Sequence, residues 1–205
     1  MTYDTLASQE SLNKTTKALI EKGYNVLIAE NASDALAKIK TLIPEKASVM
    51  NGSSMTLNQI GYSDLLKSGK IEWNDLYSKI RAESDPGKSK ELRKKSTMSD
   101  FYLGSVHALA ENGEFIIASN SGSQLPHIVF TSPNLIFVVG TQKIVPDLDS
   151  AMKRLEEYVF PLENERLKSA YGVETSISKI VIFKKENPAI GRKVNIILVK
   201  EKLGF

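Results

Sequence analysis

Residues 25–52, NVLIAENASDALAKIKTLIPEKASVMNG, decide the fold class of this chain. Residues 26–29 form an apolar run typical of a buried strand, and residues 48–51 form a second short run of that kind. Between them, apolar residues recur at helical spacing after Asn31, a favourable N-cap, and stop at Pro44, which cannot continue a helix. A strand, a helix and a strand joined by short connections predict a parallel pair with a crossover helix.

The segments on either side extend this α/β pattern. A helical pattern that stops at Lys22-Gly23 predicts an N-terminal helix. Residues 135–139 form the most hydrophobic run and predict a central strand covered on both faces. Residues 179–183 and 194–199 predict two more strands. We expect the first helix and these C-terminal strands to be appendages on a central, mostly parallel sheet.

The middle of the chain contains recognisable turns and caps. Asn112-Gly113 favours a hairpin between residues 101–110 and 114–118. Asp85-Pro86 predicts the start of a helix. Its basic residues are expected to form a solvated face, and the alternative is that they contact an anionic partner. A helical stripe from Leu148 is expected to stop before Pro161.

Composition excludes several classes of protein. The 205 residues contain no cysteine, so they can form no disulfide, thiolate nucleophile or thiolate metal site. No apolar run approaches the ~18 residues of a membrane-spanning helix, and the first residues lack the features of a secretory signal, so we expect a cytoplasmic protein and no membrane partner. The net charge of +3 is too small to indicate a nucleic-acid partner.

Two loops rich in small polar residues follow predicted strands. Residues 51–56, NGSSMT, lead into a helix, where backbone amides and hydroxyls either hold a phosphate or carboxylate or simply cap the helix. Residues 119–124, SNSGSQ, form either the opposite wall of such a site or a solvated polar turn. The carboxyl ends of strands are where α/β folds bind ligands, so the two loops together favour a site.

A few ionisable residues are candidates for chemistry. Asp100 precedes a predicted strand and either orients a ligand or binds backbone, whereas Asp147 is expected to cap a helix. His107 is expected to be a hydrogen-bonded or surface histidine. His127 adjoins the second loop and is the better candidate for a general acid or base. No His, Asp or Glu spacing indicates a metal site.

Several motifs, in order along the chain, resemble the lactate-utilisation (LUD) domain family. Residues 51–61, NGSSMTLNQIG, resemble its signature, and residues 99–114 resemble its Asp-containing strand and hairpin. Residues 138–148, VVGTQKIVPDL, resemble its Val-Gly-x-x-Lys-Ile-Val-x-Asp-Leu stretch. Residues 164–167 resemble an Asn-x-x-Arg element, and residues 191–205 resemble the closing strand and terminus.

This resemblance, to lactate-utilisation protein C in particular, implies a fold and a pathway. No Gly-, Ser- or Pro-rich linker divides residues 1–205, so we expect a single LUD-like domain with the N-terminal helix, about residues 5–22, as an appendage. The implied fold is a three-layer, Rossmann-like α/β architecture with a mostly parallel sheet. That fold is similar to those of ribose-phosphate isomerase, glucosamine-phosphate deaminase and coenzyme A transferases. Lactate-utilisation members act with partner subunits that contain flavin or an iron–sulfur cluster in oxidising lactate to pyruvate.

The chain departs from its relatives in one stretch. Many relatives with this tail carry a cysteine cluster before the last strands, whereas residues 168–179 here contain none. We therefore expect no cofactor on this chain, with electrons passing through the iron–sulfur cluster or flavin of a redox partner protein.

The leading hypothesis is an accessory protein of lactate or organic-acid utilisation that binds a small anionic ligand between the two loops. Lys143 and Arg166 are its expected cationic groups. The other expected ligand-binding residues are Gly52, Ser53, Ser54, Thr56, Ser121, Gly122, Ser123 and Gln124.

Two other classes stay open. One is an isomerase- or transferase-type enzyme acting on a sugar phosphate or an acyl-coenzyme A, with Asp100 or Glu111 as the base; fold similarity is its only support. The other is an assembly subunit without a ligand, which binds redox partners through its tail or its basic helix.

Overall fold

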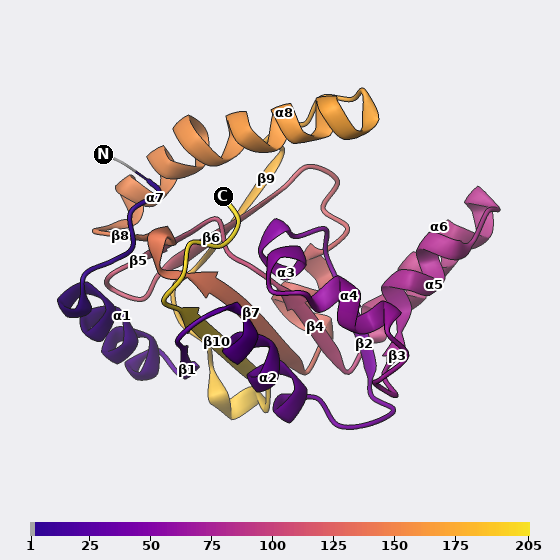
Figure 1. Cartoon of the computed structure of the whole chain (residues 1–205), viewed down its shortest axis with the longest axis horizontal. Helices are drawn as coiled ribbons and strands as arrows, with labels where there is room; N and C mark the ends of the chain where they lie inside the picture. Colours follow the sequence, from indigo (N-terminus) through magenta and orange to yellow (C-terminus); the bar gives the residue numbers. More distant parts are fainter. Residues whose placement is uncertain (1–2) are drawn as a thin grey trace.

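The computed structural model describes residues 3–205 and has a six-stranded parallel sheet at its centre (Figure 1). The strand order is β1 (Asn25–Ala29), β10 (Lys193–Val199), β7 (Asn134–Gly140), β4 (Phe101–Gly104), β2 (Ser48–Asn51) and β3 (Asn74–Asp75). The α/β class and the mostly parallel sheet are thereby confirmed. As its apolar run predicts, β7 lies inside the sheet, and all its residues after Asn134 are buried.

The positions of two strands differ from the prediction. β1 and β2 are parallel, but they are not a pair, because β10, β7 and β4 lie between them. β10 is no appendage, since it pairs with both β1 and β7 and buries residues 194–199. Consecutive side chains of a strand point to opposite faces, so the unbroken apolar run in β10 suits a strand covered on both sides. Local patterns do not specify which distant strand fills the place beside β1.

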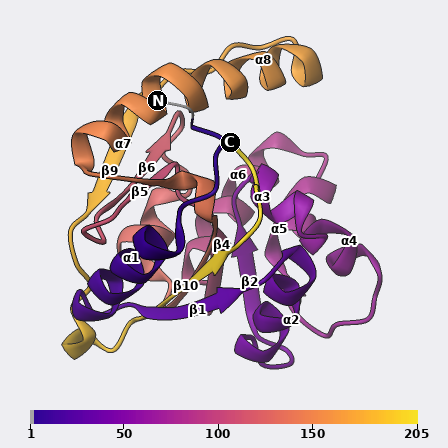
Figure 2. The ribbon, with the colours of Figure 1, turned by 60° about the vertical axis from the view of Figure 1, so that its left-hand side comes forward.

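A second, four-stranded sheet lies over part of the first (Figure 2). Its order is β8 (Ile144–Val145), β5 (Ala108–Ala110), β6 (Phe115–Ser119) and β9 (Lys179–Phe183). The predicted hairpin is confirmed, because β5 and β6 pair antiparallel around Asn112-Gly113. The expected run over residues 101–110 is divided between the sheets, with β4 in one and β5 in the other. Residues 105–107 carry the chain from one sheet to the other.

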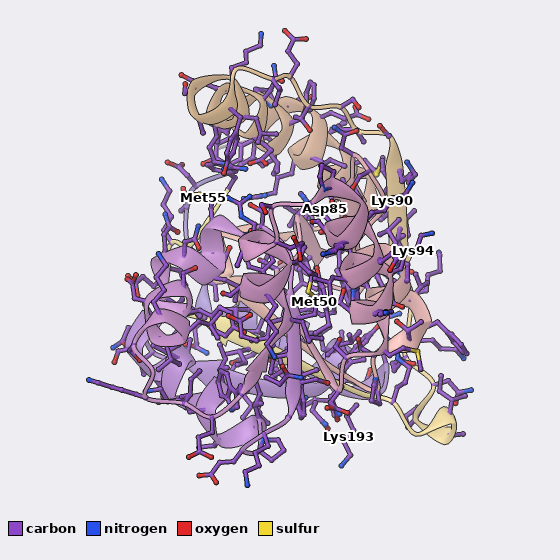
Figure 3. All side chains as sticks on the ribbon, turned by 90° about the vertical axis from the view of Figure 1, so that its right-hand side faces the viewer. Met50, Met55, Asp85, Lys90, Lys94 and Lys193 are labelled. Carbon is purple, nitrogen blue, oxygen red and sulfur yellow. The ribbon has the colours of Figure 1, made fainter. Side chains whose placement is uncertain are left out.

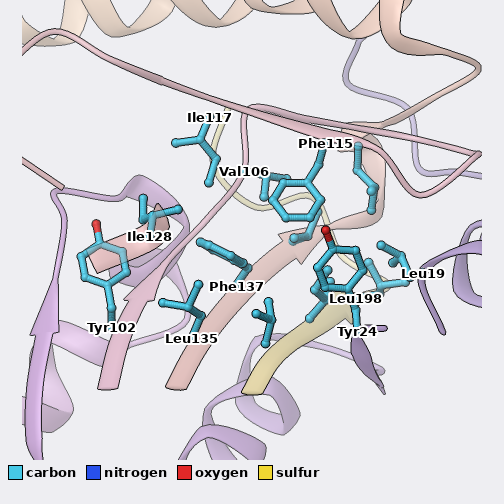
Figure 4. Close-up of a cluster of buried hydrophobic side chains, with 14 of the residues drawn as sticks. Leu19, Tyr24, Tyr102, Val106, Phe115, Ile117, Ile128, Leu135, Phe137 and Leu198 are labelled. Carbon is cyan, nitrogen blue, oxygen red and sulfur yellow. The ribbon is translucent and has the colours of Figure 1, made fainter. Parts of the chain in front are cut away.

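Helices and the second sheet cover the two faces of the main sheet. One face packs against α2 (Ala32–Leu42), α3 (Met55–Gln59) and α4 (Tyr62–Lys67). The other face packs against α1 (Gln9–Glu21), which buries Leu12 and Leu19, and against the second sheet and the π-helical turn η2 (His127–Thr131). Figure 4 shows this cluster, with Phe115 of the second sheet above Phe137 of the main sheet.

Two helical regions complete the molecule: one follows the edge strand β3, and the other follows β8. α5 (Leu76–Ala82) and α6 (Pro86–Lys95) follow the edge strand β3, and Asp85 caps α6 as predicted. No residue of α6 is buried, which agrees with a solvated basic face.

α7 (Leu148–Arg154), capped by Asp147, lies against the second sheet together with the π-helical turn η4 (Leu155–Val159). The remaining short turns are 3₁₀ segments, η1 (Ser96–Met98), η3 (Thr141–Lys143) and η5 (Pro188–Ile190).

The expected stop before Pro161 is wrong. The helix continues through η4 into α8 (Phe160–Tyr171), with Pro161 in the first turn of α8. Proline lacks the N–H that an α-helical turn needs, and the π turn widens the helix just before it. The longer helix carries α8 across the molecule, opposite the main sheet (Figure 2).

Candidate functional site

A pocket of about 560 Å³ lies at the carboxyl ends of β2 and β4, where the two sheets and α8 meet. Its walls include the loop after β2, the connection 105–107 between the sheets, and the loop after β6. Residues of η4 and α8 form the wall opposite the main sheet. Carboxyl ends of parallel strands are the usual ligand-binding edge of such sheets, so the pocket lies where the loop composition predicts a site.

Most of the predicted ligand-binding residues line this one pocket. They are Gly52, Ser53, Ser54, Thr56, Ser121, Ser123, Gln124, Lys143 and Arg166. Gly122 does not line it; it holds a positive φ of 82° at the turn, above the side chain of Lys179. The fold therefore brings together residues that are more than 100 positions apart in the sequence.

The loop after β2 caps a helix, as one of its two interpretations predicts, and it also lines the pocket. Ser54 caps α3, because its Oγ accepts a hydrogen bond from the amide of Leu57 at 3.3 Å. Gly52 is needed for space, since a Cβ there would lie 2.7 Å from the Tyr102 hydroxyl. Thr56 is buried, and its hydroxyl accepts from the Lys143 ammonium at 3.0 Å. The cap thus holds the loop, while Gly52 and Thr56 shape the pocket floor.

The loop after β6 is held by its own polar groups. Ser119 Oγ accepts from the amide of Gly122 at 3.0 Å, and Ser121 donates to Ser123 Oγ at 3.0 Å. Gln124 donates to the Ala118 carbonyl at 3.1 Å. These bonds make a preformed polar turn that still presents hydroxyls to the pocket.

Lys143 is the most unusual charged group in the pocket. It follows β7 in the turn η3 and is only 3% exposed. Its ammonium donates to Thr56 Oγ1 at 3.0 Å, Ser105 Oγ at 3.1 Å and the Val106 carbonyl at 3.3 Å. No carboxylate among residues 3–205 forms an ion pair with it. Burial, together with the nearby Arg154 guanidinium, lowers the pKa of Lys143 to about 7.

Two more basic side chains surround Lys143. Arg154 is fully buried, donates to the carbonyls of His107 and Tyr3, and lies 5.2 Å from the Tyr158 ring centre. Burial lowers the pKa of His107 to about 3, and the charges of Lys143 and Arg154 add to this shift. His107 is therefore neutral at pH 7, with Nδ1 accepting from the amide of Ala118 at 3.1 Å. Among residues 3–205, the hydrogen-bond acceptors of the Lys143 ammonium and the Arg154 guanidinium are all neutral oxygen atoms.

Comparison with known proteins agrees with this architecture. The sequence matches the family model of the LUD domain over residues 12–186. The chain belongs to the LUD domain family. Its structure is similar to that of a DUF162 family protein from Deinococcus radiodurans, with a TM-score of 0.57 and 11% identity over 95% of this chain and 99% of that one. At that identity the likeness shows the fold alone. No curated protein sequence matches the chain.

The carboxylates considered as bases for this LUD domain lie away from the pocket. Asp100 accepts from Ser48 N at 2.8 Å and Ser48 Oγ at 2.6 Å, at the amino end of β4. These two bonds lower its pKa. Glu111 lies at the hairpin turn, 2.7 Å from the Lys14 ammonium, and its pKa is lowered by that contact. Neither residue lines the pocket.

His127 does line the pocket of the LUD domain, but its ring is held in the interior. The ring stacks on Tyr102, with centres 5.0 Å apart, and Nδ1 lies 3.3 Å from Ser99 Oγ and 3.2 Å from Ser132 Oγ. Burial lowers the pKa of His127 to about 4, so the ring is neutral at pH 7.

Sequence reasoning missed the burial of Arg154, whereas His107 is hydrogen-bonded, as one of its two expected roles predicts. Arg154 interrupts the apolar stripe of α7 and η4, and a charged residue next to Leu155 was the only signal available. Within residues 3–205, no cluster of three His, Asp or Glu side chains is placed to hold a metal. No helix in that part of the chain is long and apolar enough to cross a membrane.

Proposed function

We propose that this LUD-domain protein serves in lactate or organic-acid utilisation by binding a small anionic ligand at Lys143. The observation that carries the proposal is the ammonium of Lys143, buried in a pocket beside Arg154 without a carboxylate. An isolated buried charge is costly, and proteins normally pair it. A carboxylate or phosphate entering the pocket would supply the missing counter-charge, with hydroxyls of the loop after β2 as further donors.

The redox step of lactate oxidation belongs, in this proposal, to partner subunits. The 205 residues contain no cysteine, so they offer no thiolate to an iron–sulfur cluster. An iron–sulfur or flavin partner would carry the electrons, while this chain holds the organic acid. The family membership supports the pathway, and the pocket supports the ligand class.

A subunit without a ligand is the weaker hypothesis. In a subunit without a ligand, an unpaired buried ammonium would not increase the stability of the fold, because replacing buried charge with apolar side chains is often neutral or stabilising. The charge is better explained by a ligand that needs it.

One observation favours the enzyme hypothesis as a second candidate. With a pKa of about 7, Lys143 is partly an uncharged amine at neutral pH, as a general base must be. Turnover of a sugar phosphate or an acyl-coenzyme A that disappears in Lys143→Met would favour this second candidate over simple binding.

Thermal unfolding with lactate or pyruvate tests the proposed function. A ligand at about 100 times its Kd stabilises a protein by about 2.7 kcal/mol, so we expect a rise in Tm of several degrees for the wild type. Lys143→Met keeps an unbranched side chain only one atom shorter and removes its charge, so it should show no rise.

The matched control is Lys17→Met, which removes an exposed lysine from α1, outside the pocket. It should respond as the wild type does. An equal response in Lys143→Met would refute the proposed site, as would a wild type that neither acid stabilises.

A further inference from the structure

The size of the pocket exceeds what lactate needs. Pockets of about 300–1,000 Å³ typically enclose ligands of drug size, and this one measures about 560 Å³. Lactate and pyruvate have six non-hydrogen atoms, and either would fill at most roughly a third of that volume, taking about 30 Å³, the share of one water molecule, for each atom. Lactate or pyruvate bound at Lys143 would therefore leave most of the pocket empty, so the pocket has room for a larger ligand.

Charge is concentrated at a second place in the same pocket. Among the described residues, its lining includes four cationic side chains, Arg81, Arg93, Lys143 and Arg166, and one carboxylate, Glu163. Arg166 is already paired with Glu163, through two bonds of 2.7 Å. Arg81 and Arg93 form no ion pair within residues 3–205.

The hairpin of α5 and α6 brings Arg81 and Arg93 to one side. Ser89 Oγ donates to the Ile80 carbonyl at 3.4 Å, which fixes the register of the two antiparallel helices. Arg93 follows Ser89 by one turn of α6 and so lies beside the first turn of α5, where Tyr77 also lines the pocket. Arg81 follows Tyr77 by one turn on the same face of α5. Two free guanidinium groups thus flank Tyr77.

The opposite wall at this end comes from α8. Arg166 of α8 lies near enough to Tyr77 of α5 and to Tyr171 of its own helix to interact with both electrostatically, and all three residues line the pocket. Lys90 and Lys94 project outward from α6 (Figure 3), and neither lines the pocket. Arg81 and Arg93 are exposed, as Lys90 and Lys94 are, but the two arginines differ from those lysines because they line the pocket.

We propose that the pocket holds an organic phosphate of about nucleotide size, with its phosphate at Arg81 and Arg93 and its other end at Lys143. The forked guanidinium group suits phosphate oxygens, which it binds through two parallel hydrogen bonds. Tyr77 and Tyr171 supply aromatic surface beside that phosphate. This inference rests on the proposed function, because it keeps Lys143 as the group that binds the acidic or carbonyl end.

Isothermal titration with inorganic pyrophosphate and with ADP tests the phosphate end. We expect the wild type to bind at least one of them, and the double variant Arg81→Gln/Arg93→Gln to bind it about ten-fold more weakly or worse, a loss of about 1.4 kcal/mol or more. The control Lys90→Gln/Lys94→Gln removes the same charge from outside the pocket and should change the Kd less than two-fold. Binding of neither probe, or an equal loss in both double variants, overturns the inference.

The same titration separates this inference from the proposed function. Lys143→Met should keep its affinity for pyrophosphate, which is short enough to occupy the arginine end alone. If lactate and pyruvate fail to stabilise the wild type while pyrophosphate binds through Arg81 and Arg93, the phosphate subsite stands and the proposed function fails. If the acids bind at Lys143 and neither phosphate probe binds, the proposed function stands and this inference fails.

Discussion

Between pH 7 and pH 9.5, the free energy of unfolding of the ligand-free protein is expected to rise by about 3 kcal/mol because of Lys143. Its pKa is about 7 in the folded protein, against 10.5 for an ordinary lysine. In this range the unfolded chain binds more protons than the folded one, so stability increases with pH, by at most about 1.4 kcal/mol per pH unit. Denaturant unfolding across the range measures this slope.

Other groups do not produce the same rise. Burial lowers the pKa of Arg154 only to about 10, and it raises the pKa of Tyr24, Tyr62 and Tyr102 above 10, so they titrate above the range. Lys143→Met should therefore give a flat profile between pH 7 and pH 9.5, and Lys17→Met should keep the wild-type slope. A flat wild-type profile, or the same rise in both variants, would mean that Lys143 is not desolvated as described.

On the acid side, lowering the pH from 7 to 5 is expected to cost about 4 kcal/mol of stability, roughly 2 kcal/mol for each histidine. His107 and His127 have pKa values of about 3 and about 4 in the folded protein, because both are buried. An unfolded histidine binds its proton near pH 6.5. Their stabilising effect is therefore complete above pH 6.5 and is lost as the pH falls toward their folded pKa values.

The two histidines are the only ones in the sequence, which makes a clean control possible. Asparagine can replace the accepting Nδ1 with its Oδ1 and cannot be protonated at these pH values. His107→Asn and His127→Asn should each remove about half of the acid sensitivity, and the double variant should be nearly flat between pH 5 and pH 7. Acid sensitivity that survives in the double variant would assign the effect to other groups.

Local sequence rules located most of the candidate site. Small polar residues directly after a strand lie at the carboxyl edge of a parallel sheet, and this rule places the loop 51–56, after β2, at the pocket. The loop 119–124 also lines the pocket, but it follows β6, which belongs to the second sheet and pairs antiparallel with β5 and β9, so the rule does not explain its place. The same rule explains why Asp100 is distant from the pocket, since a residue that precedes its strand lies at the opposite edge. Lys143 and Arg166 entered through the family resemblance, and both line the pocket.

The remaining features depend on contacts between distant segments. The place of β10 between β1 and β7 joins residues about 60 and 170 positions apart, and no local periodicity encodes that choice. Burial of Arg154 depends on carbonyls of His107 and Tyr3, which come from other elements. The unpaired charge of Lys143 is likewise visible only when every neighbour is known. The chemistry of the pocket thus follows from packing, whereas its position follows from the strand pattern.

The buried ammonium of Lys143 is proposed to bind the anionic ligand, and the pKa of this ammonium tests the proposal most directly. NMR of the protein carrying labelled lysine can follow that group through a pH titration, without ligand and with saturating pyruvate. We expect a pKa of about 7 in the free protein, rising by one unit or more when the carboxylate binds, because a nearby opposite charge favours the charged form. A pKa near that of an ordinary lysine in the free protein, or one that pyruvate leaves unchanged, would contradict the claim.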